Sequence, residues 1–174
     1  MLDVSVSYNR YKFLGHEFLT WLWFFVENHQ DRIRKLEPDA LSLVAGDHIV
    51  LENRRKDAVE RISIKGDDAG FEEALLALNK GAGVTELNLA YKVGENEWRF
   101  TVKAESLHIT GLKCPRTGPM DSQEDLEGAV LEKAYLIEKA IQITDRLFRE
   151  FLTFRLADTW DRKVVPQMRK WMGA

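Results

Sequence analysis

The sequence predicts an α+β domain: an antiparallel meander sheet with an aromatic N-terminal helix and a long C-terminal helix packed on it. Three observations predict this fold. An almost wholly apolar stretch, Phe13–Val26, has helical spacing. Runs that alternate at period two lie within residues 41–112, and a stretch from Ser122 to about Arg155 has no helix stop. We expect the sheet domain at residues 1–120, and the long helix with a basic helical segment at 121–174.

The aromatic stretch places most of its large apolar side chains on one face of a helix, but not all of them. Phe13, Trp23 and Phe24 fall on the side that otherwise holds polar residues such as His16 and Glu17. A helix that is apolar nearly all round is usually buried on two sides, against its own core and against a second layer or another chain. We therefore expect Phe13, Trp23 and Phe24 at an oligomer interface. At roughly 14 residues, the stretch is too short to cross a bilayer, which needs about 20.

The other segments before residue 113 follow from alternation and turn chemistry. Ala45-Gly46-Asp47 lies between two short apolar runs and is a hairpin signal, whereas Asn28–Pro38 is polar and typical of a turn region. Short turns between strands predict antiparallel neighbours in a meander. The expected elements are a short strand at Asp3–Ser7, strands at 41–44 and 48–52 joined by that hairpin, a strand at Val59–Ile64, a helix at Phe71–Leu78, and strands at Thr85–Val93, Trp98–Lys103 and Leu107–Leu112.

The long helix has Asp121 or Ser122 as its N-cap candidate, with acidic residues in the first turn. About 30 residues would span about 45 Å, which exceeds a small sheet. Lys133 and Thr144 interrupt a heptad, which favours packing across the sheet and beyond it over a coiled coil. We expect its apolar stripe to consist of Leu126, Val130, Ile137, Ile141, Phe148 and Leu152.

Motifs for catalysis and metal binding are missing from the sequence. His16-Glu17 begins like a zinc-protease helix, but residue 20 is Thr, so the second ligand is lacking. The four histidines show no ligand spacing, and neither nucleotide-binding motif is present. We therefore predict no catalytic residue, no metal, no cofactor and a non-enzymatic protein. A third hypothesis is a hydrolase site assembled from distant carboxylates and histidines, which a pocket gathering three such groups would support.

Charge and cysteine content limit the function further. The formal net charge of -3 gives no overall attraction to nucleic acid, so only a local basic patch could hold it. No basic segment precedes an apolar run at the start, and the single cysteine, Cys114, agrees with a reducing compartment, so we expect a cytoplasmic protein. In the basic stretch 146–174, Trp160 and Trp171 are better explained as packing anchors than as stacking platforms for bases. The candidate DNA contacts are Arg54, Arg55, Lys56, Lys113 and Arg116.

The aromatic stretch also carries a resemblance to a known family. Its letters FLGHEFLTWLWF resemble the FLG-x-EFL-x-WLWF/Y stretch of the bacterial RdgC family, recombination-associated DNA-binding proteins. The resemblance runs from Phe13 to the start of the long helix, and it corresponds to the C-terminal part of these longer proteins. Further similar segments follow in the family's order: Glu60–Gly66, Glu73–Leu75 with Asn79–Gly81, Trp98–Leu107 and Thr110–Pro115.

The resemblance implies a protein that binds double-stranded DNA without sequence preference and restrains the RecA recombinase as a closed homodimer with a basic central hole. Such a ring would let an acidic chain hold DNA, because only its lining must be positive. The expected partners are therefore duplex DNA, RecA and a second copy of the chain, at the nucleoid in the cytoplasm and with no membrane. The alternative is a protein-interaction or assembly module that docks through the aromatic helix and binds no DNA.

Overall fold

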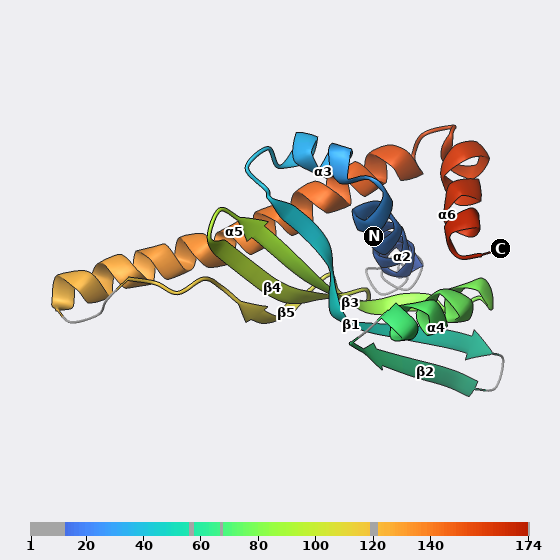
Figure 1. Cartoon of the computed structure of the whole chain (residues 1–174), viewed down its shortest axis with the longest axis horizontal. Helices are drawn as coiled ribbons and strands as arrows, with labels where there is room; N and C mark the ends of the chain where they lie inside the picture. Colours follow the sequence, from blue (N-terminus) through green and yellow to red (C-terminus); the bar gives the residue numbers. More distant parts are fainter. Residues whose placement is uncertain (1–12, 56–57, 67, 119–121, 174) are drawn as a thin grey trace, which may run out of the picture.

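The computed structural model describes residues 13–55, 58–66, 68–118 and 122–173, and it confirms the α+β class (Figure 1). The strand expected at Asp3–Ser7 lies outside the described residues. The elements are α2 (Phe13–Asn28), α3 (Gln30–Leu36), β1 (Ser42–Arg55), β2 (Ala58–Lys65), α4 (Asp68–Asn79), β3 (Gly83–Val93), β4 (Asn96–Lys103), β5 (Ile109–Lys113), α5 (Gln123–Arg155), the π-helical η1 (Trp160–Val164) and α6 (Val165–Trp171).

The five strands form one curled antiparallel sheet in the order β2-β1-β3-β4-β5. The sheet departs from a simple meander at one connection, because the chain passes from β2 to β3 through α4 and so crosses β1. Helix α4 packs on β1 and β2, and α2 packs on β3 and β1. One face of the sheet is thus covered, and it carries the alternating buried residues of β3 and β4 that the sequence predicts.

The hairpin expected at Ala45-Gly46-Asp47 is wrong, because β1 runs through these residues as one strand. Its register against β3 shifts between Ala45 and Ile49, which is the signature of a β-bulge. A Cβ atom on Gly46 would lie 2.0 Å from Oδ1 of Asn88, so glycine here leaves room for the Asn88 side chain, which donates to the Phe100 carbonyl at 3.3 Å. The turn expected at Asn28–Pro38 is also wrong in part, since it contains the short helix α3.

Trp23 and Phe24 are buried within the single chain, so the expectation that they line an oligomer interface is wrong. The ring of Trp23 lies 5.0 Å from that of Trp171 in α6 and 5.9 Å from that of Phe71 in α4. Phe24 contacts the ring of Trp171 at 5.6 Å. Helix α2 does have a second layer, as an all-round apolar helix requires, but the layer comes from the same chain. The side chain of Phe13 lies outside the described part.

Helix α5 follows the predicted bounds closely, and Ser122 caps it through a capping box with Asp125. Its predicted stripe is only partly right: Phe148 and Leu152 pack on the core, whereas four of the six residues are exposed. The buried face is instead Ala129, Leu136, Ala140, Ile143, Leu147 and Phe151. Small alanines let the helix approach the sheet closely enough for the indole of Trp98 to donate to the Leu136 carbonyl at 2.9 Å.

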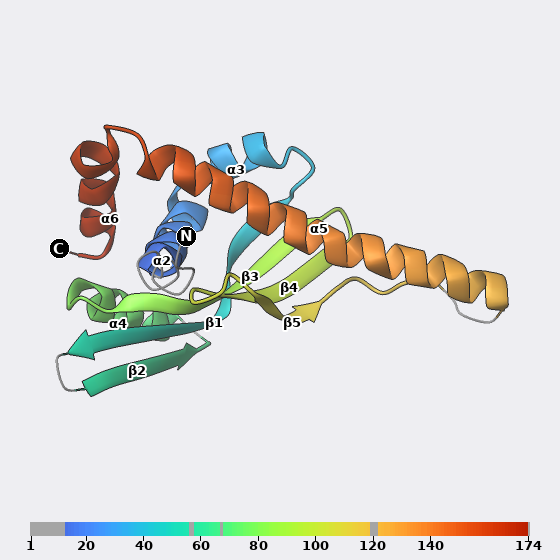
Figure 2. The same cartoon turned by 180° about the vertical axis from the view of Figure 1, so that it is seen from behind.

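The first half of α5 projects beyond the sheet in both views (Figures 1 and 2). Helices α2, α3 and α6 gather around its other half. Among the helices that the structure describes, none combines the length and the hydropathy that a membrane span requires.

Candidate functional site

Four exposed cations lie in the last two helical segments of the chain. Arg162 and Lys163 belong to η1, and Arg169 and Lys170 belong to α6. None of the four forms an ion pair with another described residue, and Arg162 donates to the backbone oxygen of Asp158 at 3.3 Å. We call these four residues the basic end.

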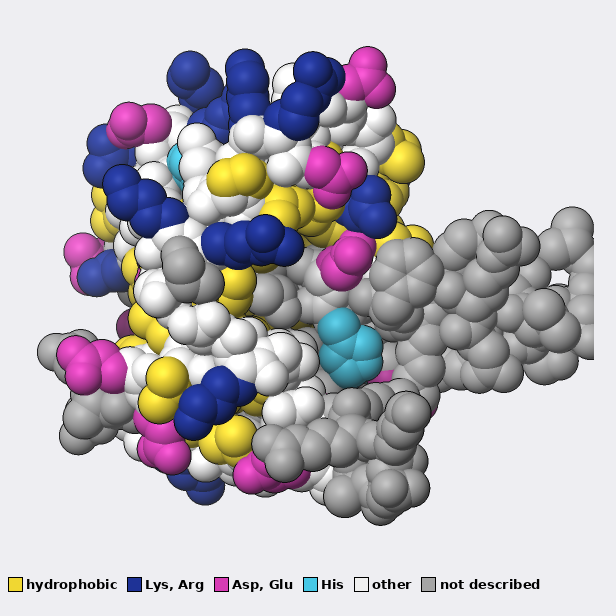
Figure 3. Space-filling view, turned by 90° about the vertical axis from the view of Figure 1, so that its right-hand side faces the viewer, with side chains coloured by type: hydrophobic (Ala, Val, Ile, Leu, Met, Phe, Trp, Pro, Cys, Tyr) yellow, Lys and Arg dark blue, Asp and Glu magenta, His cyan; other side chains and the backbone are white. Residues whose placement is uncertain are grey.

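The packing of the segment explains why these cations face solvent. Trp160, Val164 and Met168 recur every fourth residue and are buried, so the charged residues between them point outward. Pro166 at the start of α6 breaks the regular helix, and η1 takes up the change of direction. Figure 3 shows Lys and Arg side chains gathered in the upper half of this end, with acidic side chains among them.

The two tryptophans of this segment serve as packing anchors, as the sequence indicates. Trp160 is buried against the ring of Phe151 at 5.8 Å. Trp171 is half-buried against Trp23, and its indole donates to Glu27 at 3.0 Å. Both rings are thus engaged in packing within the chain, so we expect binding at this end to depend on charge rather than on stacking.

The structure does not bring the five candidate DNA contacts together. Arg54 and Arg55 end β1, at the same end of the molecule as α6 (Figures 1 and 2), although their side chains and the whole of Lys56 lie outside the described part. Lys113 ends β5 opposite Arg99 and is exposed. Arg116 is exposed in the segment that leads from β5 to α5, away from the end of β1. The sequence indicates the cations of the basic end only as part of the basic stretch 146–174.

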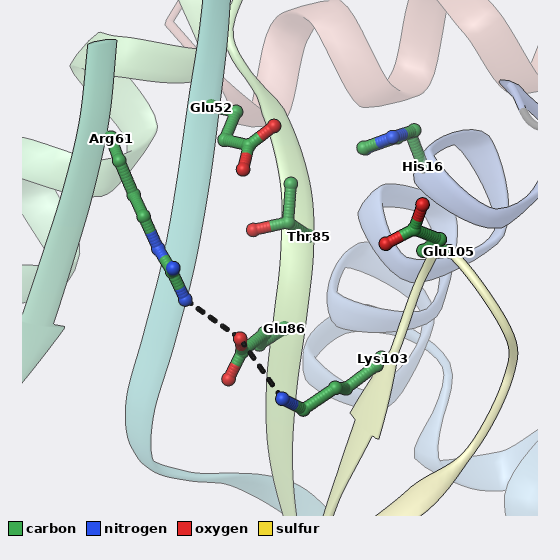
Figure 4. Close-up of a pocket in the computed structure, with 7 residues that line it drawn as sticks. All are labelled: His16, Glu52, Arg61, Thr85, Glu86, Lys103 and Glu105. Atoms are coloured by element: carbon green, nitrogen blue, oxygen red, sulfur yellow. Dashed lines mark hydrogen bonds and ion pairs between the residues drawn. The ribbon is translucent and has the colours of Figure 1, made fainter. Parts of the chain in front are cut away.

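A polar pocket of about 240 Å³ opens between α2, the strands β1, β2 and β3, and the end of β4. Its lining comes from segments that are distant in the sequence: His16, Glu52, Arg61, Thr85, Glu86, Lys103 and Glu105 (Figure 4). His16 and Glu105 lie on one side of the pocket, and Arg61 and Glu52 lie on the other.

Two local features build this pocket. A Cβ atom on Gly15 would lie 1.8 Å from the Ala104 oxygen, so glycine there lets α2 reach the end of β4 and brings His16 to the rim. The register of β1 against β3 shifts between Val50 and Leu51, and the adjacent Thr85 donates to the Val50 carbonyl at 3.1 Å.

Charge in the pocket is largely organised around Glu86. Arg61 lies 2.7 Å from its Oε1 atom, and the ammonium of Lys103 lies 3.6 Å from the same oxygen. The pocket therefore gathers an imidazole and three carboxylates, the set that the hydrolase hypothesis requires, but it fixes one carboxylate between two cations. Among the described residues, no group of histidine, cysteine and acidic side chains is arranged to hold a metal ion.

The fold and these surfaces define an α+β protein with a curled five-stranded antiparallel sheet and a cationic end. No protein-family model matches the chain, and no curated protein matches its sequence.

Proposed function

We propose that this protein binds duplex DNA without sequence preference through the basic end, as an RdgC-like DNA-binding protein. One observation carries the proposal: four exposed cations without described acid partners sit together on η1 and α6. Phosphate groups attract such a cluster even when the whole chain has a net charge of -3, because charges beyond about 8 Å are largely screened at physiological salt.

The placement of charge along the molecule supports one binding end. The first half of α5 holds five acids against two lysines, so this projecting half repels a polyanion. The acids are Glu124, Asp125, Glu127, Glu132 and Glu138. The end of β1, with Arg54 and Arg55, lies at the opposite end of the long axis, where α6 also lies. A duplex that crosses this end would meet cations from two separate segments.

The proposal is tested by fluorescence anisotropy with a labelled duplex of about 30 base pairs, titrated between about 50 and 200 mM salt. The parent protein should show a steep loss of affinity, and Arg169→Glu with Lys170→Glu should weaken binding and reduce the salt slope by about 2, since each phosphate contact contributes about 0.9. Lys65→Glu with Lys92→Glu is the matched control, because both lysines are exposed strand residues and the change in net charge is equal. No binding by the parent at low salt, or equal loss in the control, contradicts the proposal.

Control of recombination is the finer role that the resemblance implies. A protein that coats duplex DNA would compete with RecA for the same lattice, and its effect would then follow its DNA affinity. RecA-promoted strand exchange measured with the parent and with the Arg169→Glu, Lys170→Glu variant tests this role. If the parent and the variant inhibit strand exchange equally, control of recombination does not depend on DNA binding by the basic end. Such a result would point to a direct contact with RecA.

The polar pocket favours a hydrolase as the second candidate function. It places His16 and Glu105 on one wall and two further carboxylates in the same cavity. Incubation with plasmid DNA, with nitrophenyl phosphate and with nitrophenyl acetate tests it, with His16→Ala and Glu105→Gln as comparisons. Turnover that falls in both variants supports a hydrolase, whereas turnover no higher than in the variants excludes it.

A further inference from the structure

The first half of α5 leaves large apolar side chains in water. Of the eleven large hydrophobic residues exposed in the described part of the chain, six belong to this helix. Four of them lie on one side: Leu126 is 49% exposed, Val130 60%, Ile137 39% and Ile141 54%. Together with Ala134, they form what we call the α5 stripe.

The amount of apolar surface is more than scattered exposure explains. The four large stripe residues expose on the order of 300 Å² of apolar area on one side of the helix, which is the size of the largest and often functional patch on a typical monomer. Leu131 and Tyr135 are exposed farther round the helix, outside the stripe. These large residues do not lie on the side of α5 that faces the core, which carries the small residues Ala129 and Ala140.

The spacing of the stripe is the same in both directions along the helix. Leu126 and Ile141 are equally far from the point between Lys133 and Ala134, and so are Val130 and Ile137. A second copy laid antiparallel would therefore place its Ile141 opposite Leu126 and its Ile137 opposite Val130. This reciprocity is the condition for a two-fold interface, and the small Ala134 at the centre permits close approach.

The projection of α5 gives a second copy room to dock. The stripe spans about 22 Å at 1.5 Å per residue, and the sheets of two antiparallel copies would lie toward opposite ends of the helix pair, because each sheet covers only the second half of its helix. The beginning of the second helix would then reach the level of Ile141. There, a largely apolar groove of about 390 Å³ lies between α5 and the residues that enter β5. It is lined by Phe18, Leu107, Ile109, Ile141 and Phe148, with His108, Thr144 and Asp145 beside them.

From these features we propose that two copies of the chain associate as an antiparallel dimer through the α5 stripe, with Leu126 of each copy seated at the groove of the other. Glu127 and Glu138 flank the stripe on one side, and the antiparallel arrangement brings each close to the other glutamate of the second copy. Salt screens this repulsion. The association is independent of the DNA-binding proposal and strengthens with salt, whereas DNA binding weakens.

Sedimentation of the full chain from about 1 to about 200 µM, in about 50 and about 300 mM salt, measures the association. The parent should form a dimer that is tighter at the higher salt. Val130→Glu with Ile137→Glu should raise the dimer Kd at least about 100-fold, since burial of each side chain is lost and charge enters the interface. Leu76→Glu with Leu156→Glu is the control, because both leucines are exposed elsewhere, and circular dichroism verifies the fold of each variant. A monomer at every concentration, or an unchanged dimer in the stripe variant, overturns the proposal.

Cysteine crosslinking tests the register itself. In a Cys114→Ser background, Ala134→Cys should form an intermolecular disulfide at the two-fold axis, where each residue faces its own counterpart. Gly128→Cys is exposed on the opposite side of the helix and should remain reduced. Crosslinking at Gly128→Cys with none at Ala134→Cys would overturn the antiparallel arrangement even if a dimer exists.

Discussion

The hydroxyl of Tyr91 donates a hydrogen bond to Glu37 at 3.1 Å, and both side chains are buried. Arg146 donates to the other carboxylate oxygen, and the ammonium of Lys139 lies 3.7 Å from the first. Burial, followed by the charge of Glu37, raises the pKa of Tyr91 above its usual range. A single buried carboxylate thus joins the segment after α3 to β3 and to α5.

Replacement of this carboxylate should destabilise the fold. Glu37→Gln keeps the shape but removes the charge that two cations and a phenol share, so we expect the free energy of unfolding to fall by about 2–4 kcal/mol. Chemical denaturation measures it. Glu97→Gln, which removes the exposed carboxylate beside Arg99, should leave stability nearly unchanged. Equal effects of the two substitutions would show that the buried cluster contributes no more than a surface pair.

His29 should make stability depend on pH in the acidic range. Its ring lies 5.2 Å from that of Phe24 and 5.6 Å from that of Phe25, and burial, followed by the charge of Arg32, lowers its pKa below 6.5. As pH falls through 6.5, the unfolded chain takes up a proton that the folded chain resists, so stability present above that pH is lost below it.

The change His29→Phe should flatten this dependence, because the phenyl ring keeps the aromatic contacts and does not titrate. Thermal unfolding at several values between about pH 5 and pH 7.5 gives the slope for the parent and for the variant. The same slope in both proteins would mean that another group is responsible for the acid sensitivity.

The two glycines Gly15 and Gly128 should respond in opposite ways to alanine. A Cβ atom on Gly15 would lie 1.8 Å from the backbone oxygen of Ala104, which cannot move without shifting β4, so Gly15→Ala should cost about 3 kcal/mol or more. Nothing lies within 4 Å of a Cβ atom on Gly128, so Gly128→Ala should stabilise α5 by about 0.5–1 kcal/mol. Denaturation midpoints compare them, and a neutral Gly15→Ala would contradict the close approach of α2.

The sequence predicts most elements because local patterns determine them. Alternation in β3 and β4 marks Leu87, Tyr91 and Trp98 as buried, and the capping residue Ser122 marks the start of α5. The bulge at Gly46 has the same turn chemistry as a hairpin, and only the pairing with β3 on both sides of it decides between the two.

The predictions that proved wrong concern features that depend on packing between distant segments of the chain. Helix α5 has two apolar stripes. The hydrophobicity pattern predicts that the stripe with the larger residues is buried, but the stripe with Ala129 and Ala140 is the one that packs on the sheet, because small residues permit a close approach. For Trp23 and Phe24, the pattern demands a second layer but does not say whether it belongs to the same chain. The sequence does not predict the polar pocket, because its residues come from several separate segments of the chain.

Charge reversal at the two separated groups of predicted contacts should show which end of the molecule meets DNA. Arg54 and Arg55 end β1 at the end of the molecule where α6 lies. Lys113 ends β5 and Arg116 follows it, away from the end of β1. Because phosphate contacts act locally, Arg54→Glu with Arg55→Glu should weaken duplex binding and reduce the salt slope by about 2, and Lys113→Glu with Arg116→Glu should change neither by much. Anisotropy titrations of both variants make the comparison at equal net charge. A larger loss from the Lys113 and Arg116 pair would place the duplex along the β5 edge instead of across the basic end.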